Sequence, residues 1–163
     1  MIKLRRAVAF DAAAIQEVHK DSIRNIASSF YPPEIISAWS NHLGTQDTIR
    51  KHQMAIDAGT EVVIVAEFED KIVGFGTMVP QTGELRAVYV SSSAKRQGIA
   101  TQILSSLENL ARGFGLSELH MDASISAEAF YKARGFVELE RKKHKLSSGA
   151  EMDCVVMKKR LDG

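Results

Sequence analysis

The sequence predicts an α/β protein whose helices flank one mixed, mostly antiparallel sheet. Segments that favour strands and helices follow one another in the order strand, two or three helices, three strands, helix, strand, helix and two strands. Short turns separate the three central strands, so they should pair as antiparallel neighbours. Repeats, linkers and low-complexity stretches are missing from the sequence, and we therefore expect a single domain over residues 1–163.

The first sixty residues predict one short strand and then helices. Apolar and basic residues alternate over 2–6, which is typical of a strand. Asp11 can then cap a helix. The apolar residues of that helix recur at helical spacing: Ile15, Val18, Ile23 and Ile26. Pro33 suits the first turn of a second helix, and a third helical segment covers 48–58 and ends at a glycine.

A change to β-branched residues then predicts three consecutive strands. Residues 61–68 contain an unbroken run of valine and isoleucine, and Glu69-Asp70 supplies a turn. Residues 71–79 form the partner strand of this hairpin. A second turn at 80–83 leads into the third strand, 84–90.

The second half of the chain predicts helices and strands in turn. Residues 97–114 carry apolar side chains on one helical face and end among glycines. A strand over 116–123 and a helix over 126–134 follow. The last two strands are expected at 136–141 and 152–161.

Composition excludes several classes of protein and site. A net charge of +1 argues against a nucleic-acid partner, and the basic run 141–145 is typical of a solvated strand end. The single cysteine, Cys154, excludes an internal disulfide and any cysteine-rich metal site, and we expect it to be buried. The first ten residues lack the apolar core of a signal peptide, and no apolar run approaches the length of a membrane span. We therefore expect a cytoplasmic protein with no metal ion and no membrane partner.

The segment between the third central strand and the following helix carries the clearest chemical signal. It runs Lys95-Arg96-Gln97-Gly98-Ile99-Ala100-Thr101. Small residues let a ligand approach the backbone, and the first turn of a helix offers unpaired N–H groups with a positive dipole end. The spacing is neither that of a Walker loop nor that of a dinucleotide fingerprint. This segment predicts a site for a phosphate group, although a helix start with a packing glycine is the structural alternative.

Two motifs together resemble the GNAT superfamily of N-acetyltransferases. The family pattern is Arg or Gln, two variable residues, Gly, one variable residue, and Gly or Ala; here it is 95–100, with Lys95 in the first position. Further on, 129–136 resembles the family's Phe-Tyr signature that ends in Gly-Phe. The order of predicted elements also fits this fold, least clearly over 20–58. The resemblance implies a sheet that is splayed between its fourth and fifth strands.

The resemblance also implies acetyl-CoA as the acetyl donor and predicts which residues hold it. The pantetheine arm is expected to pair with the backbone of strand four at Val88 and Val90. The diphosphate is expected on backbone amides at the helix start. These cofactor-binding candidates are Lys95, Arg96, Gln97, Gly98, Ile99, Ala100 and Thr101. Ser124 stands where many family members carry an asparagine, so its contact with the cofactor should be weaker.

The catalytic candidates are Tyr131 and Glu84. Tyr131 matches the family tyrosine that protonates or hydrogen-bonds the CoA sulfur, and an aromatic core residue is the alternative. Glu84 begins strand four and is a candidate base acting through water, with a solvated strand end as the alternative. His120 and Asp122 share one face of strand five, and either is a candidate for lining the acceptor side. The oxyanion donor is expected to be a strand-four amide near Val88.

The sequence predicts the donor more sharply than the acceptor. We expect an acetyl-CoA-dependent N-acetyltransferase that moves the acetyl group directly to the amine of a small molecule or peptide. The alternative is a non-catalytic acyl-CoA-binding module with the same fold. The aromatic residues of 29–39 are candidates for an acceptor pocket, or for core anchors of the helix pair. Exposed strands near the C-terminus are compatible with a homodimer.

Overall fold

The computed structural model describes residues 1–95 and 97–162 and contains a seven-stranded sheet in the order β1-β2-β3-β4-β5-β7-β6. The strands are β1 (Lys3–Arg6), β2 (Val62–Phe68), β3 (Lys71–Val79), β4 (Glu84–Val90), β5 (Glu118–Ser124), β6 (Val137–Lys145) and β7 (Glu151–Arg160). Only β4 and β5 pair in parallel, and the other neighbouring pairs are antiparallel. The predicted mixed, mostly antiparallel sheet is confirmed.

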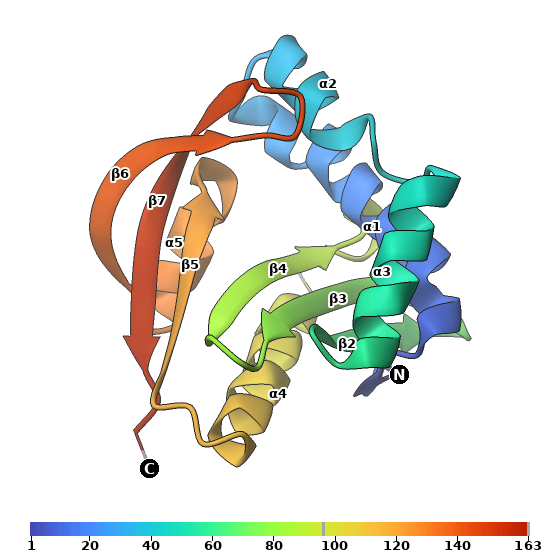
Figure 1. Ribbon diagram of the computed structural model, residues 1–163, viewed down its shortest axis with the longest axis vertical. Coiled ribbons are helices and arrows are strands. Elements are labelled where there is room, and N and C mark those ends of the chain that lie inside the picture. Colours follow the sequence, from blue (N-terminus) through green and yellow to red (C-terminus); the bar gives the residue numbers. More distant parts are fainter. Residues whose placement is uncertain (96, 163) are drawn as a thin grey trace.

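Five α-helices cover the two faces of this sheet (Figure 1). They are α1 (Ala12–Asn25), α2 (Pro33–Ser40), α3 (Gln46–Ala58), α4 (Ile99–Gly113) and α5 (Glu128–Ala133). One apolar cluster joins α4 and α5 to one face, and two others join α1 and α2 to the opposite face. In the part of the chain described, no helix combines the length and the hydropathy that crossing a membrane requires.

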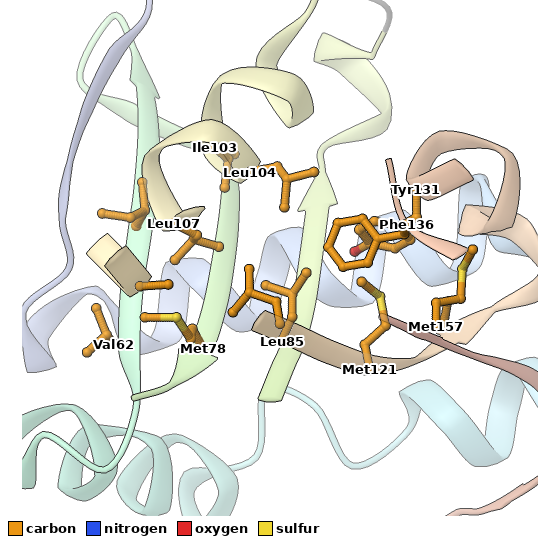
Figure 2. Packing of buried hydrophobic residues seen from close by; sticks show 14 of the residues in the cluster. Val62, Met78, Leu85, Ile103, Leu104, Leu107, Met121, Tyr131, Phe136 and Met157 are labelled. Atoms are coloured by element: carbon orange, nitrogen blue, oxygen red, sulfur yellow. The ribbon is translucent and has the colours of Figure 1, made fainter. Parts of the chain in front are cut away.

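The layer formed by α4 depends on two glycines of β3. A Cβ atom added at Gly76 would lie 2.6 Å from Cγ2 of Ile103 and 2.7 Å from Cδ1 of Leu107, both on α4. Gly74 is nearly as close to the same helix. Because these positions carry no side chain, α4 packs directly on the backbone of β3, and Figure 2 shows its leucines and isoleucine over the sheet.

A β-bulge interrupts β4 near its middle. The pairing advances by one residue in β3, from Thr77 to Met78, while it advances by two in β4, from Ala87 to Leu85. Arg86 is therefore the extra residue. A bulge bends its strand and increases the local twist, and it often lies beside a functional site.

The bulge also changes which face the residues of β4 present. Leu85 and Val88 both contact the apolar cluster beneath α4, although they are three residues apart. Ala87 and Tyr89 pack instead on the side of α1. The regular alternation of a strand would not place Leu85 and Val88 on one face, so the extra residue accounts for the arrangement.

The sheet is splayed between β4 and β5. Their register contains a single pair, Glu84 with His120, and one hydrogen bond joins the amide of His120 to the carbonyl oxygen of Gly83 at 3.1 Å. Beyond this pair the strands diverge, and β5, β6 and β7 curve away from β4 (Figure 1). The splay implied by the family resemblance is present.

Two local expectations need correction. Asp11 precedes α1, but its side chain does not cap that helix; its carboxylate accepts from the amide of Val8 and from the guanidinium of Arg5. The pair with Arg5 lowers the pKa of Asp11 below its usual value. The sixth strand is also longer than predicted, because the basic run 141–145 continues β6 instead of ending it.

Candidate active site

The start of α4 forms an open backbone cradle. Gly98 precedes the helix with a φ of 74°, a conformation that favours glycine, and a Cβ there would meet nothing within 4 Å. Gln97 and Thr101 are exposed, whereas Ile99 is buried in the core. The side chain of Ile99 thus anchors the helix while its first amides, which lack intrahelical partners, remain available to an anion.

Basic residues flank this cradle. Lys95 precedes it and is exposed, while Arg96 lies outside the described residues. Arg134 follows α5 and donates from Nε and Nη2 to the Thr101 hydroxyl at 3.0 and 2.6 Å. Its guanidinium also lies 4.1 Å from the centre of the Phe130 ring. A fixed positive charge therefore lies beside the first turn of α4.

The backbone of β4 is free on the side that faces the splay. The amide of Ser91 donates to the carbonyl oxygen of Val73 on β3 at 2.8 Å. In an antiparallel pair such contacts alternate along the strand, so the backbone groups of Tyr89 point to β3 and those of Val88 and Val90 point toward β5. β5 has diverged at this level, which leaves these polar groups without a strand partner.

Tyr131 lies in the core beneath this part of β4. It is 4% exposed, and its ring packs edge-on against Phe130 and Phe136. Figure 2 shows Tyr131 beside Phe136. Val88 and Val90 contact the same apolar cluster. Burial raises the pKa of the Tyr131 phenol, and the nearby Tyr89 adds to the rise, so the group keeps its proton at neutral pH.

A cavity of about 320 Å³ opens on the opposite face of the sheet, between β4 and β5. Its walls come from α2, β4, β5, β6 and β7. The lining residues are Trp39, Glu84, Leu85, Arg86, Tyr89, Asp122, Ser124, His144, Met152 and Cys154. The structure thus brings Glu84 and Ser124 together in one cavity, while Tyr131 lies across the sheet from them.

Ion pairs shape the β4 wall of this cavity. Nε of Arg86, the bulge residue, donates to Oε1 of Glu84 at 3.0 Å, and its Nη1 donates to Oε2 of Glu61 at 3.2 Å. The carboxylate of Glu84 is therefore already engaged by a permanent cation.

A second group of charges forms the wall made by β5 and β6. Oδ2 of Asp122 lies 3.3 Å from Nζ of Lys142 and 3.4 Å from Nδ1 of His144. His120 does not line the cavity; its Nε2 lies 3.2 Å from the carbonyl oxygen of Thr82. Of the two residues expected on this face of β5, only Asp122 reaches the cavity.

The aromatic residues of 29–39 divide between the two expected roles. Trp39 lines the cavity. Tyr31 is a core anchor, since its hydroxyl donates to the carbonyl oxygen of Asp153 at 2.6 Å and accepts from the amide of Ile125 at 2.7 Å. Phe30 is 53% exposed and belongs to neither group. Cys154 is buried, as expected, and forms part of the cavity wall.

Sequence reasoning missed three residues of this region. Arg134 lies inside the signature that contains Tyr131, so its charge was a visible signal. Asp21 on α1 accepts from the amide of Ser92 at 2.7 Å and so holds the loop before the cradle. His144 belongs to a basic run that was expected to be solvent-facing. Nothing local in the sequence connects Asp21 or His144 to the site.

Comparisons with known proteins agree with this geometry. A family model described as the acetyltransferase (GNAT) domain matches residues 28–161. A solved GCN5-related N-acetyltransferase from Rhodopseudomonas palustris superposes with a TM-score of 0.87 at 25% identity, over 98% of this chain and 95% of that one. YncA of Salmonella typhimurium, a putative acetyltransferase solved with acetyl-CoA, gives a TM-score of 0.73 at 18% identity, over 100% and 95% of the two chains. The latter likeness concerns the fold.

Two curated proteins match shorter stretches. The [citrate [pro-3S]-lyase] ligase of Klebsiella pneumoniae is 28% identical over 88 residues, which are 54% of this chain and 25% of that protein. The aminoglycoside N(6')-acetyltransferase type 1 of Acinetobacter genomosp. 13 is 36% identical over 76 residues, 42% of this chain and 52% of that protein. The chain spans about half the length, or less, of these relatives. Because the family model covers most of its residues, the chain belongs to the acetyltransferase (GNAT) family.

Proposed function

We propose that this protein transfers an acetyl group from acetyl-CoA directly to the amine of an acceptor. The observation that carries the proposal is the splay between β4 and β5, which links a phosphate cradle, an unpaired strand backbone and a cavity. The acetyl-CoA complex of the Salmonella protein and the activity named for the Acinetobacter relative support the same donor and reaction class.

In this proposal the backbone supplies most of the donor's contacts. The diphosphate binds the amides of 97–101, with charge from Lys95 and Arg134. Arg96 is a further candidate outside the described residues. The pantetheine arm pairs with the outward backbone groups of Val88 and Val90 and so adds a short strand to the open edge.

The same arrangement would place the reacting atoms between two groups of residues. A β4 amide near Val88 stabilises the tetrahedral oxyanion. The protonated phenol of Tyr131 donates to the departing sulfur from the α5 side. The acceptor approaches through the cavity, whose wall includes Trp39 and Glu84. Ser124 lies there too, but its hydroxyl is 2.9 Å from that of Ser126, which leaves it less free for a cofactor contact.

Two measurements test the proposal. Isothermal titration with CoA and with acetyl-CoA should show that both bind. If neither ligand released or absorbed heat, the proposed donor site would be contradicted. Release of free thiol from acetyl-CoA across a panel of amines, amino acids and peptide N-termini should show turnover with at least one acceptor. Binding without any turnover would favour the acyl-CoA-binding module that lacks catalysis.

A further inference from the structure

We propose that His144 is the base that deprotonates the acceptor amine, and that Asp122 positions its imidazole. This inference rests on the proposed acetyl transfer. The two residues come from different strands, β6 and β5, and both line the cavity between β4 and β5. Nδ1 of His144 lies 3.4 Å from Oδ2 of Asp122, just beyond the usual hydrogen-bond distance.

The contact with Asp122 decides which nitrogen of His144 is basic. A carboxylate beside Nδ1 favours the tautomer that carries its proton on Nδ1, so the lone pair lies on Nε2. The His144 side chain is 48% exposed, which leaves room for an amine beside the ring. A base held in one tautomer by a carboxylate is the arrangement that general-base catalysis requires.

The charged groups around His144 favour it over Glu84 as the base. Lys142, next along the same face of β6, pairs with Asp122 and not with the imidazole. Across the cavity, Glu84 and Arg86 on β4 are paired with each other. On β7, Cys154 lines the same cavity, and burial raises the pKa of its thiol and keeps it neutral. Among the described residues lining the cavity, His144 is the base without a cation of its own.

The proposed step balances in protons and electrons. Nε2 of His144 takes one proton from the acceptor ammonium, and the freed lone pair attacks the thioester carbonyl carbon. The carbon–sulfur bond then breaks and the sulfur takes a proton from Tyr131 or water. The nitrogen loses a second proton on forming the amide, and this proton restores the group that protonated the sulfur. The imidazolium passes its proton to solvent, so the net products are the amide, free CoA thiol and one proton.

The test compares five variants, one of them Glu84→Gln, with an amine that the wild type acetylates. His144→Gln should lower kcat about a hundredfold and remove the fall in kcat/KM toward acidic pH. Imidazole added to His144→Ala should restore activity. Asp122→Asn should lower kcat severalfold with little change in KM, because the imidazole loses the carboxylate that orients it. The matched control is His120→Gln, since His120 lies outside the cavity; its kcat should stay within about twofold of wild type.

The outcomes separate this inference from the proposed function. Wild-type protein that acetylates no amine contradicts the proposed function itself. Wild-type turnover with an unchanged pH profile in His144→Gln leaves acetyl transfer standing and overturns the role of His144. If Glu84→Gln loses the fall in kcat/KM toward acidic pH while His144→Gln keeps it, the base is Glu84 instead. Thermal unfolding of each variant shows whether a loss of rate reflects misfolding.

Discussion

Tyr131 is 4% exposed, and its ring packs between Phe130 and Phe136, so removal of its hydroxyl alone is a clean substitution. Tyr131→Phe keeps the ring contacts with Phe130 and Phe136, so we expect the midpoint of thermal unfolding to change little. Loss of the proton donor should lower kcat by about ten- to a hundredfold while the Kd for CoA stays nearly constant. Steady-state kinetics and titration measure both quantities. Unfolding of this variant would instead show that the hydroxyl serves the core.

His19 predicts a dependence of stability on pH. Its ring stacks on Tyr89 with centroids 4.3 Å apart, and its buried Nε2 has no hydrogen-bond partner among the described residues. Burial lowers the pKa of His19 from its usual 6.5 to about 3. Between these two pH values the imidazole is protonated in the unfolded chain and neutral in the folded protein. The free energy of unfolding should fall by about 2 kcal/mol as the pH drops from 6.5 by two units.

The matched variant for this prediction is His19→Phe, which keeps an aromatic ring between Phe75 and Tyr89. Its free energy of unfolding, from urea titrations at several pH values, should lose the part of the acidic slope that His19 contributes. A slope identical to that of the wild type would show that the folded protein accommodates the protonated imidazole.

At the scale of elements, β4 offers a direct report on donor binding. The amides of Val88 and Val90 point into the splay and should exchange with solvent in the free protein. Acetyl-CoA paired with this edge should slow their exchange by about tenfold or more. The amide of Tyr89, which faces β3, is the internal control and should change little. Equal protection at all three positions would indicate a global effect and not pairing along the edge.

The contact between α4 and β3 makes a second prediction at this scale. Gly76→Ala places a methyl group 2.6 Å from Ile103 and 2.7 Å from Leu107, so α4 must shift. We expect a loss of about 1–3 kcal/mol in the free energy of unfolding, measured with denaturant. Gly113→Ala is the control, because a Cβ at the last residue of α4 meets nothing within 4 Å. Comparable losses in both variants would contradict the packing argument.

Element types followed from the sequence because their signals are local. The valine run of β2, the left-handed Glu69-Asp70 turn and the glycine after α3 each act within a few residues. Element boundaries differ from the prediction where one residue adopts a special backbone conformation. The helix α4 begins two residues later than predicted because Gly98 adopts a left-handed φ. The bulge at Arg86 was not predicted, since it depends on the register with β3.

At the scale of the molecule, donor binding should stabilise a sheet whose two halves meet at one residue pair. Acetyl-CoA at a hundred times its Kd should add about 2.7 kcal/mol to the free energy of unfolding. Arg134→Gln should reduce the corresponding rise in Tm, because it removes a charge beside the cradle. Arg112→Gln, in the last turn of the same helix, should leave the rise intact. Differential scanning fluorimetry at one fixed acetyl-CoA concentration for all variants measures these shifts, and equal shifts would exclude a role for Arg134.

The site was predictable from the sequence only where contiguous residues form it. The cradle at 95–101 is one continuous segment, whereas the cavity joins Trp39, Asp122 and His144 from distant parts of the chain. Asp122 was a candidate because it shares a strand face with His120, but periodicity does not say which of the two meets β6. That choice depends on the curvature of the sheet beyond β5.

The divergence of β4 from β5 has a further consequence for the protein without its donor. Strand edges with unpaired N–H and C=O groups are where chains associate wrongly, and proteins usually cover, charge or shorten them. Here two such edges face each other inside one sheet, and their shared opening narrows to the pair of Glu84 and His120. A foreign strand would have to enter a wedge closed at one end, which few segments fit. The shape that we propose for donor binding should therefore also disfavour aggregation along this edge when no donor is bound.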